Sequence, residues 1–77
     1  MRPEKTESKF VVCIDNEGYP ASLELLKIYQ TLPDDKGAKH SLMRVIDESG
    51  EDYLYPERFF VAIKLPQAAK EVFLRAA

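Results

Sequence analysis

The segment from Arg44 to Ile63 constrains the fold more than any other part of this chain. Alternating and β-branched residues predict three short strands, of which the first begins two residues before this segment, over 42–47, 52–55 and 59–63. Gly50 supplies the positive φ that a short hairpin loop with a bulge requires, and Pro56 ends a strand because it cannot donate to a ladder. Two reversals in so short a segment predict a small, curved sheet or barrel.

The same alternation assigns side chains to the two faces of this predicted sheet. In the strand over 52–55 we place Leu54 on the core side and Tyr53 and Tyr55 on the opposite side. The strand over 59–63 has one wholly apolar face, which we assign to the core: Phe59, Val61 and Ile63.

The length and composition limit the chain to one small domain. With 77 residues, 45% of them hydrophobic and 31% charged, the sequence is typical of a folded domain rather than a disordered one. The net charge of −2 gives no general attraction to nucleic acid or to an anionic membrane. A single cysteine, Cys13, excludes an internal disulfide, and no apolar run is long enough to span a membrane. The predicted location is the cytoplasm.

Outside the central segment, proline, glycine and polar residues also indicate where the predicted elements begin and end. We expect residues 1–8 to form a flexible tail and residues 9–77 to form the single domain, with a strand over 9–15 and a loop over 33–40. Pro66 suits the first position of a helix, so a short C-terminal helix is predicted from about residue 66. Its narrow apolar stripe should cover one opening or edge of the sheet: Ala69, Val72, Phe73 and Ala76.

Residues 23–32 are ambiguous from pattern alone. Four apolar residues fall at helical spacing, which favours an amphipathic helix: Leu25, Ile28, Tyr29 and Leu32. The β-branched and aromatic content of Lys27–Leu32 suits a strand instead.

The order of elements resembles that of Src-homology-3-like barrels. The run Pro56-Glu57-Arg58-Phe59-Phe60 is similar to the Pro-x-x-Tyr corner and following valine of that family. The resemblance implies a strand at 27–32 and a mainly all-β fold, a five-stranded barrel with a short C-terminal helix. The Arg44–Pro56 run is also similar to that of short bacterial proteins with no assigned activity, which implies a bacterial source. The chain lacks tryptophan and the Ala-Leu-Tyr-Asp-Tyr signature of the peptide-binding branch, which argues against recognition of polyproline helices.

One group of side chains predicts a binding site. An amphipathic groove that stacks on a peptide or a base would use Tyr19, Tyr53, Tyr55, Pro56 and Phe59. The alternative interpretation is that these aromatic residues merely cover the outside of a small barrel. The predicted function is a non-catalytic protein-binding or adaptor module that binds another protein or a peptide.

A nucleic-acid-binding regulator is the alternative function. It would use a basic patch on the loop over 33–40 and the following strand: Lys36, Lys39, His40 and Arg44. Asp34, Asp35 and the acidic total weigh against it.

We predict neither catalysis nor a cofactor or metal site. Cys13 lies in an apolar strand, where an inert thiol is usual, and one cysteine with His40 is too few for zinc. The carboxylates of the hairpin surround a turn too short to enclose calcium, so we interpret them as a solvated tip: Asp47, Glu48, Glu51 and Asp52.

Overall fold

The computed structural model describes residues 9–76 of the chain. The predicted tail over 1–8 lies outside the described residues. The strands are β1 (Lys9–Cys13), β2 (Ile28–Leu32), β3 (Leu42–Ile46), β4 (Asp52–Pro56) and β5 (Phe60–Ile63). The helices are α1 (Asp35–Lys39), the 3₁₀ turn η2 (Glu57–Phe59) and α2 (Gln67–Ala76).

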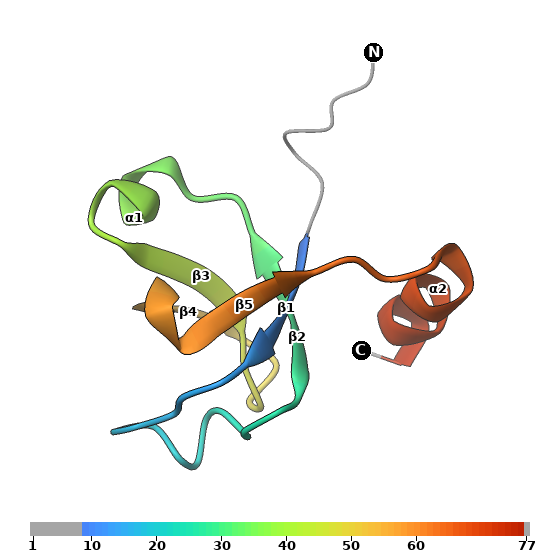
Figure 1. Cartoon of the computed structure of the whole chain (residues 1–77), viewed down its shortest axis with the longest axis horizontal. Coiled ribbons are helices and arrows are strands. Elements are labelled where there is room, and N and C mark those ends of the chain that lie inside the picture. Colours follow the sequence, from blue (N-terminus) through green and yellow to red (C-terminus); the bar gives the residue numbers. More distant parts are fainter. Residues whose placement is uncertain (1–8, 77) are drawn as a thin grey trace.

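The strands form one antiparallel sheet of five in the order β4-β3-β2-β1-β5 (Figure 1). The predicted mainly β class with a C-terminal helix is therefore confirmed. Within residues 9–76 the end strands β4 and β5 are joined by η2 but are not hydrogen-bonded to each other, so closure into a barrel is not shown. The strand interpretation of 27–32 is also confirmed, because β2 pairs with both β1 and β3.

One face of the sheet carries the core. Register places Val11 opposite Tyr29 and Cys13 opposite Phe60, and these partners project from the same face. All four are buried, together with Val45 of β3. Two residues from the connecting segments, Leu23 and Phe59, also belong to the core and are 0% and 2% exposed.

The predicted facing of β4 is wrong. Tyr55 is buried at 3% exposure, whereas Leu54 is 37% exposed. Tyr55 lies opposite Met43 of β3, which itself packs against the core. The burial of Tyr55 is tolerated because its hydroxyl donates a hydrogen bond to Asp47, so no polar atom is left unpaired.

The predicted core face of the last strand is wrong in part. Phe59 is buried, but it belongs to η2 rather than to β5. β5 begins at Phe60, which faces the core, and Val61 on the opposite face is 48% exposed. The turn η2 shifts the alternation by one residue, and a one-residue shift exchanges the two faces.

The predicted loop over 33–40 contains the short helix α1. Asp34 is its N-cap, and its carboxylate accepts a hydrogen bond from the Gly37 amide at 2.8 Å. Gly37 is buried against β4, since a Cβ atom at that position would lie 2.9 Å from Cδ2 of Leu54. The aspartates and the glycine that predicted a loop also suit a short helix with an aspartate N-cap, so composition alone could not distinguish the two.

The predicted C-terminal helix is present as α2, beyond one end of the sheet (Figure 1). Phe73 packs edge-on against Phe10 of β1, with ring centroids 5.1 Å apart. Val72, which belongs to the predicted apolar stripe, is 55% exposed. Within the described part of the chain, neither α2 nor any other helix is long and apolar enough to cross a membrane.

The hairpin between β3 and β4 is built as predicted. Gly50 has a φ of +85°, the left-handed conformation expected for this turn. Its amide donates to the carbonyl of Asp47 at 3.0 Å.

Candidate functional site

A depression of about 380 Å³ lies where the β3–β4 hairpin meets the segment between β1 and β2. Seven residues line this feature, which we call the tyrosine depression: Tyr19, Ser22, Asp47, Ser49, Tyr53, Leu54 and Tyr55. Tyr19 and Tyr53 present exposed rings, at 43% and 49% exposure.

Tyr19 is held over the core by its own loop. Its amide donates to the Asn16 carbonyl at 2.8 Å, and the Leu23 amide donates to the Tyr19 carbonyl at 3.0 Å. The ring contacts Tyr55 edge-on with centroids 5.0 Å apart, and Phe59 at 6.2 Å. These contacts give the exposed ring a fixed position, because edge-to-face packing on buried aromatic rings is favourable.

Asp47 is a buried carboxylate in the tyrosine depression, with 6% exposure. It accepts hydrogen bonds from the Tyr55 hydroxyl at 2.5 Å, the Ser49 hydroxyl at 2.6 Å and the Ser49 amide at 2.9 Å. Burial alone would raise the pKa of Asp47, but these hydrogen bonds outweigh it and the pKa is lowered. Burial first, and then the bond to Asp47, raises the pKa of Tyr55 to about 12. Near neutral pH the pair is thus a charged carboxylate and a neutral hydroxyl.

A second network lies beside the first. Lys27 contacts Glu48 at 2.7 Å, and the Tyr29 hydroxyl donates to the same carboxylate at 2.5 Å while accepting from the Glu24 amide. The lysine, first, and the tyrosine lower the pKa of Glu48. Glu48 is therefore neutralised by a cation.

The carboxylates nearest the tyrosine rings are not neutralised in this way. Ion pairs among the described residues involve neither Asp47 nor Glu51. Glu51 accepts a hydrogen bond from the Tyr53 hydroxyl at 3.0 Å, which raises the pKa of Tyr53. The tyrosine depression therefore contains one carboxylate without a cationic partner among the described residues, Asp47, and Glu51 is bonded to the hydroxyl of one of its rings.

The structure brings together four of the five predicted binding residues. Tyr19 packs on Tyr55 and Phe59, and Tyr53 lines the same depression. Pro56 is half-buried and does not line it. Of the four, Tyr19 and Tyr53 are exposed, whereas Tyr55 and Phe59 are buried and contact the Tyr19 ring.

Sequence reasoning missed Asp47 as part of this site, because it was assigned to a solvated tip. A signal was present: an aspartate two residues before a serine in a turn is typical of side-chain capping of the turn amides. Ser22 was also missed, and nothing in its sequence surroundings distinguishes it.

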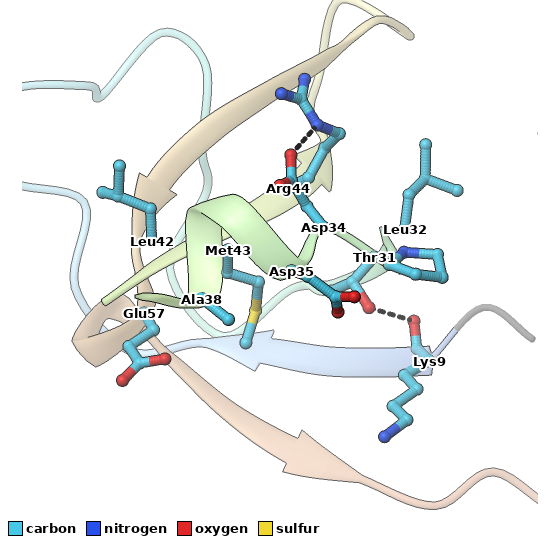
Figure 2. Close-up of a pocket in the computed structure, with 11 residues that line it drawn as sticks. Lys9, Thr31, Leu32, Asp34, Asp35, Ala38, Leu42, Met43, Arg44 and Glu57 are labelled. Carbon is cyan, nitrogen blue, oxygen red and sulfur yellow. Dashed lines mark hydrogen bonds and ion pairs between the residues drawn. The ribbon is translucent and has the colours of Figure 1, made fainter. Parts of the chain in front are cut away.

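A second and larger groove, of about 680 Å³, lies between α1 and the ends of β1, β2 and β3 (Figure 2). Its charged residues are three carboxylates and two bases: Asp34, Asp35, Glu57, Lys9 and Arg44. Arg44 contacts Asp34 at 2.7 Å and Asp52 at 2.9 Å, so its charge is already paired. The Gly37 amide, first, and Arg44 lower the pKa of Asp34.

The four residues of the predicted basic patch do not all line this second groove. Lys36 and Lys39 are exposed on α1 and His40 is its exposed C-cap, but none of the three lines the groove in Figure 2. Only Arg44 lines it.

Cys13 is fully buried, and burial raises the pKa of its thiol.

Comparison of the chain with protein-family models, curated proteins and solved structures found no match. The geometry described above therefore carries the functional argument by itself.

Proposed function

We propose that this protein is a non-catalytic protein-binding module, and that the tyrosine depression receives a basic, extended segment of the partner. Two exposed tyrosine rings, of which Tyr19 is held by edge contacts with Tyr55 and Phe59, suit a peptide, since tyrosine supplies a large contact area at low entropic cost. A cytoplasmic location and a bacterial source remain predictions of the sequence.

The observation that supports this proposal most strongly is that the Asp47 carboxylate is hydrogen-bonded within the chain but not paired with a cation among the described residues. A carboxylate offers about four acceptor positions, and three donors within the chain occupy Asp47. The carboxylate is ionised, lies in the tyrosine depression and has no cationic partner among the described residues. A guanidinium or ammonium group held between Tyr19 and Tyr53 would approach this charge and contact the ring faces.

We also propose that the curved sheet is a Src-homology-3-like barrel. The strand order β4-β3-β2-β1-β5 and the one-turn corner at η2 support this assignment. The resemblance at Pro56–Phe60 adds to it. The distinct feature of this chain would be a tyrosine and carboxylate site in place of a tryptophan wall.

The test is a titration of the ¹⁵N-labelled chain with a short, capped peptide that alternates arginine and proline, followed by amide chemical shifts. We expect shifts at Ser49, Tyr53 and neighbouring amides. Tyr53→Ala should weaken binding at least about fivefold, because exposed aromatic anchors carry much of the energy of such contacts. Val72→Ala is the matched control, since Val72 is comparably exposed on α2.

Two results would contradict the proposal. One is equal binding of a matched peptide with glutamate in place of arginine. The other is binding of a single-stranded oligonucleotide with a steep salt dependence that Lys36→Gln with Lys39→Gln removes, which would favour the nucleic-acid-binding regulator instead.

A further inference from the structure

A separate groove of about 460 Å³ lies where β1 begins and β5 ends, and Lys70 of α2 also lines it. We call it the lysine groove; it is lined by Lys9, Phe10, Ile63, Lys64, Leu65 and Lys70, among others. None of its residues lines the tyrosine depression. None of the residues that line it was predicted from the sequence to take part in binding.

All the charged residues of the lysine groove are lysines. Phe10 and Ile63 form the end pair of the β1–β5 register, and Lys9 and Lys64 are the residues that adjoin this pair along the chain. Lys70 of α2 adds a third positive charge, and ion pairs among the described residues neutralise none of the three.

The groove also offers an apolar floor and a strand edge. Phe10 is 4% exposed and is fixed by Phe73, while Ile63 and Leu65 are half-buried. β5 is the last strand of the sheet order, so one of its edges has no strand neighbour within residues 9–76. Ala62 and Ile63, the last two residues of β5, line the groove together with Lys64 and Leu65, which follow them.

We propose that the lysine groove binds an extended, acidic segment of another protein, which adds a strand to the free edge of β5. Carboxylates of that segment pair with Lys9, Lys64 and Lys70, and its alternate apolar side chains pack on the floor. Charge complementarity selects this occupant, because every charged residue of the groove is basic on a chain whose net charge is −2. A nucleic acid is less suited, since the groove's aromatic ring is buried and cannot stack on a base.

The experiment uses the full chain, ¹⁵N-labelled, and a short capped peptide that alternates glutamate and valine. We expect amide shifts along β5 and at Lys9, with affinity that falls as salt is raised. Lys64→Gln with Lys70→Gln should weaken binding at least about fivefold, as expected for the loss of two exposed ion pairs. Lys36→Gln with Lys39→Gln is the control, because those lysines are exposed on α1 and lie outside the groove.

Other results would overturn the proposal. Equal losses in the two double variants would mean that the peptide senses only the overall charge. Tighter binding of inorganic phosphate or of a single-stranded oligonucleotide would assign the lysines to a phosphate ligand. Shifts along β5 that depend on protein concentration without peptide would make a second copy of the chain the occupant. Failure of the arginine peptide at the tyrosine depression would leave this result unaffected, because the two titrations use different peptides and variants.

Discussion

Substitution of Tyr55 by phenylalanine tests the hydrogen bond to Asp47 directly. The change keeps the ring, and so keeps the edge contact with Tyr19 at 5.0 Å, but it removes the hydroxyl that donates to Asp47 at 2.5 Å. Both partners are buried, at 3% and 6% exposure. A hydrogen bond to a charged group contributes about 1.5–3 kcal/mol, so the free energy of unfolding should fall by about that amount.

This loss is large for so small a domain, whose core supplies only about 3–5 kcal/mol. In urea unfolding with a slope of about 1 kcal/mol per molar, the midpoint should fall by about 1.5–3 M. Tyr53→Phe is the matched control: it also loses a hydroxyl, but one that is exposed and bonded to Glu51, and its midpoint should not change.

The dependence on pH gives a second measurement. Because the pKa of Asp47 is lowered in the folded chain, its contribution is present above its ordinary value of 3.8 and is lost as the pH falls through the folded value. The gap between wild type and Tyr55→Phe should narrow in acid. Because the pKa of Tyr55 is raised from 10.0 to about 12, wild type should also lose stability between these values, and the variant should lack this step. An equal midpoint for the two tyrosine variants, or a gap that does not change with pH, would refute the reasoning.

Two further predictions concern the hairpin and the helix α2. Gly50→Ala should cost about 1 kcal/mol of stability through backbone strain alone, since φ is +85° and no atom lies within 4 Å of the added methyl group; an unchanged urea midpoint would contradict this. Phe73→Ala should remove the contact with Phe10 and speed amide exchange in α2 while exchange in β3 and β4 stays unchanged; uniform acceleration would mean that α2 supports the whole sheet.

The positions of most strands could be predicted from the sequence, but which side chains of each strand face the core could not. Gly50 and the alternation around it predicted the β3–β4 hairpin, because a glycine turn and a period of two are local signals. Alternation alone cannot distinguish the two faces of β4. Tyr55 is the buried residue because Asp47 satisfies its hydroxyl, and that partner lies eight residues earlier.

The candidate site could also be predicted only where it depends on local sequence patterns. The aromatic residues were visible as a group, and register brought Tyr53 and Tyr55 to one face as their spacing requires. The role of Asp47 depends on the burial of its side chain, which cannot be predicted from its position among other charged residues of the hairpin. The lysine groove depends on the pairing of β1 with β5, a contact between distant residues that no local pattern encodes.

The pairing of β1 with β5 also has a consequence for biosynthesis. Among the strands within residues 9–76, β1 is made before the others, yet its second neighbour, Phe60–Ile63, is made after β2, β3 and β4. Until then the nascent chain presents an unpaired edge along Val11 and Val12, the kind of edge that templates association between chains. A chain that stops before Phe60 should therefore aggregate even though its central hairpin is complete. Synthesis of β5 is the step that ends this exposure.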